Sequence, residues 1–184
     1  MNYIKKVNKN IDFKLFMLFI LSLPVYKLLN RPFGKIHSLF SFIDKWIPLV
    51  PAFILVYHSW MPFLLTNLFF FSRRDRKNFR LTLSHLFLSQ WAVYITFLLF
   101  KTKVPRLAPS GNTVFENLIK FTYKIDKPYA AFPSIHAMTT FILIFSIFRS
   151  NWKLEYKAFS VFFSLLILAS ILLVKQHVFL DLLA

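Results

Sequence analysis

The sequence contains no cysteine, so disulfide bonds and thiol chemistry are excluded, and cysteine usage says nothing about the redox compartment. Acidic residues are also scarce, with 7 Asp and Glu against 23 Lys and Arg, which gives a net charge of +16. Such an excess can indicate nucleic-acid binding, but here the basic residues lie between apolar runs instead of along one folded face. Cytoplasmic loops and anionic headgroups account for them better, so we expect membrane lipids as partners and no nucleic acid.

Apolar side chains are what the sequence has in abundance, since 57% of its 184 residues are hydrophobic and 20% are aromatic. A soluble domain is nearer to about 45–50% apolar. Residues 46–72 and 81–100 carry no Asp, Glu, Lys or Arg, and each run can cross a hydrocarbon core about 30 Å thick. We therefore predict an all-α fold, a polytopic membrane helical bundle in a single domain, 1–184. Five full spans and a truncated sixth are expected at 11–29, 48–71, 81–100, 132–148, 157–174 and 176–184.

The connections between the apolar runs indicate the topology. The densest charge run, 73–80, and the basic segment 149–157 are expected to be cytoplasmic loops, on the same side as the N-terminus. The longest connection, 101–131, then lies outside. Within it, Thr113 and Glu116 have the spacing of a capping box, which predicts a short amphipathic helix in the membrane interface. This outer connection is nevertheless basic, and an anionic ligand is one reason for that.

A histidine and an aspartate stand in the apolar end of the chain. His177 and Asp181 are four residues apart, a spacing that places them on one face of a helix. A carboxylate and an imidazole are unfavourable in an apolar segment unless each satisfies the other. His136, in the stretch 132–137, also adjoins a long apolar run, and the predicted topology brings both stretches to the same membrane face. We therefore expect the two stretches to form one site there.

These residue types suit phosphoryl transfer, and the reaction requires no metal or other cofactor. The imidazole of His177, oriented by Asp181, can attack phosphorus, and His136 can protonate the departing alkoxide. The phosphoryl oxygens need fixed hydrogen-bond donors and positive charge. The candidates for these substrate-binding contacts are Arg106, Ser134, Lys175, Lys101 and Lys103.

Each candidate also has a purely structural interpretation. His177 and Asp181 could be a structural pair, Ser134 could serve only as a helix cap, and Arg106 could be an interfacial residue with its stem in the lipid. A metal site made of His136, His177 and Asp181 is a further alternative, although three such ligands without a second carboxylate are few.

The motifs resemble those of the type 2 phosphatidic acid phosphatase (PAP2) superfamily. Its Pro-Ser-x-His segment resembles residues 133–136, its closing His-x-x-x-Asp segment resembles 177–181, and its first, Lys…Arg-Pro segment loosely resembles 101–106. From about residue 11 to residue 184 the chain is similar to the branch related to inositol phosphorylceramide and sphingomyelin synthases, notably in 43–48 and 126–136. Two positions depart from the family pattern, with Ile171 where an arginine is usual and Leu107 where a proline is usual.

The resemblance implies a bundle of about six membrane helices with its site on the extracytoplasmic face of the cell membrane. It also implies the roles assigned above to His177, Asp181 and His136. The expected function is a metal-independent integral-membrane phosphatase that acts on lipid phosphates or lipid pyrophosphates through a phosphohistidine. Two alternatives stay open: a transferase that moves a phospho-head group between lipids, as inositol phosphorylceramide synthases do, and a non-catalytic membrane relative. The oligomeric state is left open.

Overall fold

The computed structural model describes residues 2–183, with side chains from residue 10 onward. Its elements, in chain order, are α1 (Asn2–Ser22), α2 (Val25–Leu29), β1 (Ile36–His37), α3 (Phe42–Trp46), η1 (Pro51–Phe53), α4 (Ile54–Arg74), α5 (Arg76–Leu99), β2 (Lys101–Thr102), α6 (Val114–Ile125), α7 (Ile135–Arg149), α8 (Leu154–Leu173) and η2 (Phe179–Leu182). The all-α class is thus confirmed for the described chain, apart from the two-residue parallel pairing of β1 with β2.

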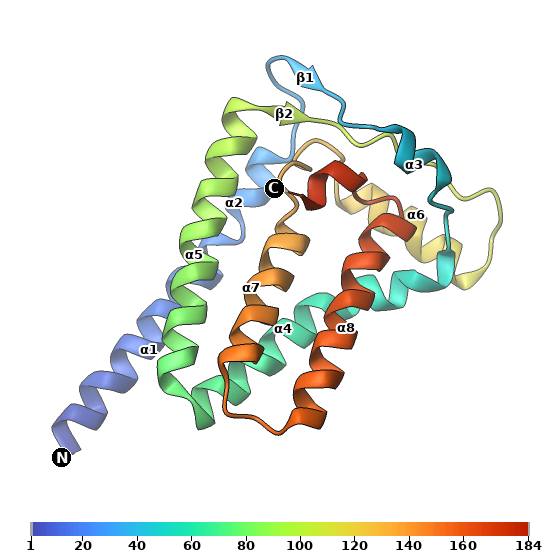
Figure 1. The fold of residues 1–184 in the computed structure, drawn as a ribbon. Helices are drawn as coiled ribbons and strands as arrows, with labels where there is room; N and C mark the ends of the chain where they lie inside the picture. The colour runs from blue at the N-terminus through green and yellow to red at the C-terminus, as the bar shows by residue number, and fades with distance from the viewer. Residues whose placement is uncertain (1, 184) are drawn as a thin grey trace.

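The body of the bundle consists of α4, α5, α7 and α8, with α1 packed along α5 (Figure 1). Helix α7 lies between α5 and α8, and α4 crosses behind them (Figure 1). Among the described residues, Pro51–Arg74, Arg76–Leu99 and Leu154–Leu173 are long and apolar enough to cross a membrane, and Ile135–Arg149 is a shorter apolar helix. These lengths and compositions support a helical membrane bundle, whereas the expected number of five full spans stays a prediction.

The side chains are distributed as in a membrane protein, with apolar groups on the outside and polar groups between the helices. Leu154 and Phe145 are 78% and 67% exposed, so the outer surface is apolar. Polar groups instead join helices inside: Thr82 on α5 donates to the Ser146 hydroxyl on α7 at 2.7 Å, and the Asn78 side chain donates to the Ser146 carbonyl at 2.7 Å. Such buried bonds between helices satisfy polar groups that lipid cannot, and they fix α5 against α7.

The first expected span, 11–29, is not one continuous helix. Helix α1 ends at Ser22 and α2 begins at Val25, immediately after Pro24. Proline has no N–H to donate and its ring collides with the preceding turn, so the helical ladder is interrupted there. The break lets the short helix α2 pack on α5 at the end of the bundle where α6 also lies.

The charge run 73–80, expected to be a loop, is almost entirely helical. Helix α4 continues to Arg74 and α5 begins at Arg76, so Asp75 alone separates them. The Asp75 carboxylate accepts a hydrogen bond from the Asn78 N–H at 3.0 Å and thereby caps α5. The other full spans were expected at 48–71, 81–100, 132–148 and 157–174, and they correspond to α4, α5, α7 and α8 with ends shifted by several residues.

Helix α6 begins with the expected capping box. The Thr113 hydroxyl accepts from the Glu116 N–H at 3.3 Å, and the Glu116 carboxylate accepts from the Thr113 N–H at 3.0 Å. Ile119 and Thr122 are the buried residues of α6, and the Thr122 hydroxyl lies 2.9 Å from Nε2 of His58 on α4. Helix α6 is therefore docked over one end of the bundle, next to α4.

Candidate active site

The end of α8 positions His177. The backbone that follows α8 does not form the helix expected at 176–184. Lys175 has a left-handed backbone, with φ of 54°. The N–H of Lys175 bonds to the Leu172 carbonyl, and the N–H of Gln176 bonds to the Ile171 carbonyl, both at 3.0 Å. This is a Schellman ending, which stops α8 and reverses the chain. Residues 179–182 then form the 3₁₀ helix η2, so the expectation of a sixth α-helix was wrong.

His177 and Asp181 are in contact, although the contact forms across a turn instead of along an α-helix. Nδ1 of His177 lies 3.1 Å from Oδ2 of Asp181, which also accepts from the Val178 N–H at 3.1 Å. Asp181 is 1% exposed and His177 is 8% exposed. Phe179 donates its N–H to the Asp44 carboxylate at 2.7 Å, which fastens η2 to α3.

His136 lies beside this pair, in the first turn of α7. The Ser134 hydroxyl accepts from the Ala137 N–H at 3.2 Å and caps α7. The Ser134 N–H donates to the Asp181 carbonyl at 2.9 Å, so η2 and the start of α7 are directly joined. The centroids of the His136 and His177 rings are consequently only 5.6 Å apart.

Two aromatic side chains of α4 hold the His136 ring. The ring centroid of Tyr57 lies 5.0 Å from that of His136, and the Trp60 ring lies 4.3 Å away. Trp60 in turn donates its indole N–H to the Thr139 hydroxyl at 2.9 Å, which fixes the indole against α7. The imidazole of His136 is thus oriented by packing, and its ring nitrogens form no hydrogen bond with the described residues.

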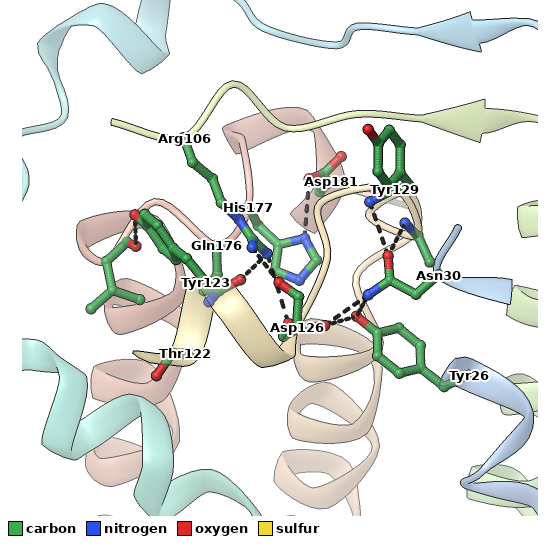
Figure 2. Close-up of polar contacts among 12 residues, drawn as sticks. Tyr26, Asn30, Arg106, Thr122, Tyr123, Asp126, Tyr129, Gln176, His177 and Asp181 are labelled. Carbon is green, nitrogen blue, oxygen red and sulfur yellow. Dashed lines mark hydrogen bonds and ion pairs between the residues drawn. The ribbon is translucent and has the colours of Figure 1, made fainter. Parts of the chain in front are cut away.

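Arg106 lies between α6 and the turn that carries His177 (Figure 2). Its guanidinium donates to the side-chain oxygen of Gln176 and to the backbone carbonyl of Asp126. The Asp126 carboxylate lies 3.7 Å from it, and the Tyr123 ring is 4.8 Å from the guanidinium carbon. Nε of Arg106 is buried without a partner among the described residues, so one donor of the fork is uncommitted.

Asp126, Tyr26 and Asn30 form a cluster that sequence reasoning missed (Figure 2). The Asp126 carboxylate accepts from the Tyr26 hydroxyl at 2.7 Å and from the Asn30 amide at 2.8 Å. The Asn30 side-chain oxygen accepts from the N–H groups of Tyr129 and Ala130, at 2.9 and 3.1 Å. Its position as a carboxylate in the otherwise basic connection 101–131 was the signal in the sequence that could have identified Asp126.

The three candidate lysines lie elsewhere. Lys101 donates to the Leu29 carbonyl at 2.7 Å, and its ammonium nitrogen is 3.8 Å from the centroid of the Phe33 ring. Burial lowers the pKa of Lys101 to about 8. Lys175 donates to the carbonyls of Asp44 and Ile47, and burial lowers its pKa while Asp44 raises it.

Lys103 is the third of these lysines, and its ammonium lies 5.8 Å from the Tyr129 ring. None of the three lysines is among the residues that line the cavity beside the histidines. The structure therefore brings together His136, His177, Asp181, Ser134 and Arg106, and directs the lysines to other partners in the described part of the chain.

A cavity of about 490 Å³ opens beside the two histidines. It extends between α2, α4, α5, α6 and α7, and its lining includes Tyr57, Gln90, Asp126, His136 and His177. Most of its surface is apolar, as in most cavities that bind small molecules. Within the described residues, no group of three or more His, Cys, Asp or Glu side chains is arranged to hold a metal ion.

This arrangement can support nucleophilic chemistry. An ionised Asp181 holds the proton of His177 on Nδ1 and leaves Nε2 with its lone pair free. The second imidazole, His136, has its ring centroid 5.6 Å from that of His177 and can supply or remove a proton.

Comparison with known proteins agrees with the motifs in these positions. A search of curated proteins and a search of solved structures each gave no match. The model of one family, described as the PAP2 superfamily, matches residues 33–184, and the chain therefore belongs to the PAP2 superfamily.

Proposed function

We propose that the protein is an integral-membrane phosphatase that acts on lipid phosphates or lipid pyrophosphates, without a metal, through a phosphohistidine at His177. The observation that carries this proposal is the meeting of His136 with the His177–Asp181 pair, with ring centroids 5.6 Å apart, at one end of an apolar cavity. Membership of the PAP2 superfamily suggests phosphatase or phosphotransferase activity on lipid phosphates.

In the first step, Nε2 of His177 attacks phosphorus and a P–N bond forms as the bond to the lipid oxygen breaks. His136, protonated, donates its proton to the departing alkoxide. In the second step, His136 removes a proton from water, which attacks phosphorus and breaks the P–N bond, so that inorganic phosphate leaves and His177 is restored. Asp181 stabilises the positive charge that His177 carries while it is phosphorylated.

Arg106 is the cation best situated to bind the phosphoryl oxygens. It contacts Gln176, the residue next to His177, and its buried Nε has no partner among the described residues. An N–H of a guanidinium donates a strong, charge-assisted hydrogen bond to a phosphate oxygen. The Ser134 hydroxyl, at the N-terminus of α7, is the second proposed contact. Lys101, Lys103 and Lys175 act on the phosphate only at longer range, because their ammonium groups have other partners.

The proposal extends to topology and partners. The whole chain, 1–184, acts as one domain in the cell membrane, with a cytoplasmic N-terminus and the histidines at the extracytoplasmic end. The apolar lining of the cavity and the apolar outer surface support membrane lipids as partners and a lipid phosphate as substrate.

One observation favours the alternative of transfer to a second lipid. The cavity continues from the histidines to Gln90 and Tyr94 on α5, so it is larger than a phosphate requires. The side-chain oxygen of Gln90 is buried there without a hydrogen-bond partner among the described residues. A hydroxyl donor from an acceptor lipid would satisfy this oxygen and compete with water for the phosphohistidine.

The test measures phosphate released from phosphatidic acid by the purified protein with EDTA present. We expect release by the wild type and by His85→Ala, which removes an exposed histidine of α5, and none by His177→Ala. Radiolabelled lipid product in place of free phosphate would identify the transferase. Activity in His177→Ala equal to that of the wild type would refute the mechanism. Absence of a trapped phosphohistidine with any lipid phosphate would favour a non-catalytic relative.

A further inference from the structure

A second cavity, of about 700 Å³, lies at the opposite end of the bundle from the histidines. It is enclosed by the last turn of α4, the connection between α7 and α8, and the first turn of α8, which all lie at the lower end of Figure 1. It is lined by Phe70, Arg74, Asp75, Asn151, Trp152, Lys153 and Tyr156. None of these residues belongs to the proposed phosphatase site.

The two cations of this cavity have no carboxylate partner. Within the described chain, Arg74 contacts the Phe70 ring, at 5.9 Å, and neither Arg74 nor Lys153 forms an ion pair. Asp75 also lines the cavity, and its carboxylate accepts from the N–H of Asn78 at 3.0 Å. The wall therefore carries two cations and one carboxylate, which leaves it with a net positive charge, and the exposed Glu155 in the first turn of α8 is not part of the lining.

Trp152 lines the cavity, and its indole N–H is uncommitted within the described chain. Nε1 of Trp152 is buried and has no hydrogen-bond partner among the described residues. The indole is held between the Phe71 ring, stacked at 4.4 Å, and the Tyr156 ring, at 4.7 Å. Helix α8 starts after Lys153 without a side-chain cap, so its first backbone N–H groups are unsatisfied by the cap residue. A buried indole donor without an acceptor is unfavourable, and an anionic oxygen would relieve it.

We propose that this cavity binds the phosphate headgroup of an anionic phospholipid from the leaflet opposite the histidines. Cationic side chains, an indole N–H and helix N-terminal amides together are the donor set that a phosphodiester requires. A lipid is favoured over a soluble phosphate because the helices that form the cavity expose large apolar side chains nearby: Leu154 and Phe159 on α8 and Phe69 on α4. Acyl chains can lie along this surface while the headgroup enters the cavity.

Bound in this way, the lipid bridges the α4–α5 junction and the α7–α8 connection. Because α4 carries Tyr57 and Trp60 and α7 carries His136, the headgroup would stabilise the same helices that hold the site. The expected result is a more stable bundle in anionic membranes, without any direct contact between this lipid and the histidines.

The experiment uses the full chain in detergent and measures retained lipid by native mass spectrometry and the rise in Tm. The probes are phosphatidylglycerol, phosphatidylcholine and inorganic phosphate. We expect phosphatidylglycerol to bind and stabilise the wild type, and Arg74→Gln/Lys153→Gln to weaken its binding about 10- to 30-fold. The matched control is Arg73→Gln/Lys77→Gln, which also removes one arginine and one lysine at this end of the bundle, but outside the cavity lining. We expect this control to bind phosphatidylglycerol as the wild type does.

A milder variant tests the indole donor. Trp152→Phe keeps an aromatic ring between Phe71 and Tyr156 but has no N–H, so phosphatidylglycerol binding should weaken about three- to tenfold while the lipid-free Tm holds or rises. Equal weakening in the two double variants would show diffuse attraction of lipid to basic residues and would overturn the proposal. Equal stabilisation by inorganic phosphate alone would assign the cavity to a soluble anion and would likewise overturn it.

Discussion

Replacing Asp181 with asparagine separates the charge of this side chain from its shape. Oδ2 of Asp181 accepts from His177 Nδ1 and the Val178 N–H, each at 3.1 Å, and an amide oxygen can accept both bonds. Asparagine lacks the negative charge that faces the imidazolium formed when His177 carries a phosphoryl group. At 3.1 Å and an effective dielectric constant of about 20, that attraction is worth about 5 kcal/mol. We therefore expect Asp181→Asn to lower kcat about a thousandfold.

The assay is phosphate release from phosphatidic acid in mixed micelles with EDTA, analysed as kcat and KM separately. A charge effect confined to the transition state lowers kcat and leaves KM nearly unchanged. The matched control is Asp44→Asn, because the Asp44 carboxylate also holds η2, through the Phe179 N–H at 2.7 Å, but does not bond to His177. Losses of the same size in the two variants would refute the electrostatic reasoning and leave only the anchoring of η2.

Three other perturbations follow from the same geometry. His136→Ala should slow phosphatidic acid hydrolysis about 10²- to 10⁴-fold but affect an aryl phosphate much less, because a phenolate leaves without protonation; equal losses with both substrates would contradict its role as the acid. Arg106→Lys should lower kcat/KM about 10- to 100-fold, since the three N–H groups of an ammonium share one nitrogen and cannot reproduce the planar fork that bonds to Gln176 and Asp126 while Nε stays available, and wild-type kinetics would exclude Arg106 from phosphate binding. Burial lowers the pKa of Lys101 to about 8 from 10.5, so above pH 8 the folded protein releases a proton that the unfolded chain keeps. The free energy of unfolding should therefore rise between about pH 8 and pH 10 in the wild type relative to Lys101→Met, and a Tm difference between the two that stays constant with pH would contradict this.

Local features of the fold were predictable from the sequence. Thr113 and Glu116 have capping-box spacing, and they form that box at the start of α6. The uncharged run 81–100 corresponds to most of α5. Helix ends were harder to predict. The positive charge of residues 73–80 indicates a loop, whereas Arg and Lys are also good helix formers. One residue, Asp75, was enough to separate two helices there.

The candidate site was predicted in composition but not in geometry. The spacing of His177 and Asp181 suggested an α-helix, whereas the contact depends on a left-handed backbone at Lys175 and a 3₁₀ helix after it. Non-glycine residues rarely adopt that conformation, so the sequence carried no signal for the turn. The sequence suggests the lysines as phosphate ligands because of their charge, but it does not show where each ammonium group points. Lys101 and Lys175 donate instead to backbone carbonyls.

The sequence by itself determined that this protein is helical and apolar on its outside, and that it carries the PAP2 motifs, because periodicity, charge spacing and short motifs are properties of neighbouring residues. Only the tertiary structure decided that His136 lies 5.6 Å from His177, that Arg106 is held by Gln176 and Asp126, and that a second cavity forms beside Trp152. These contacts join segments that are far apart along the chain. Their geometry depends on how helices pack and turns close, and no local pattern specifies that.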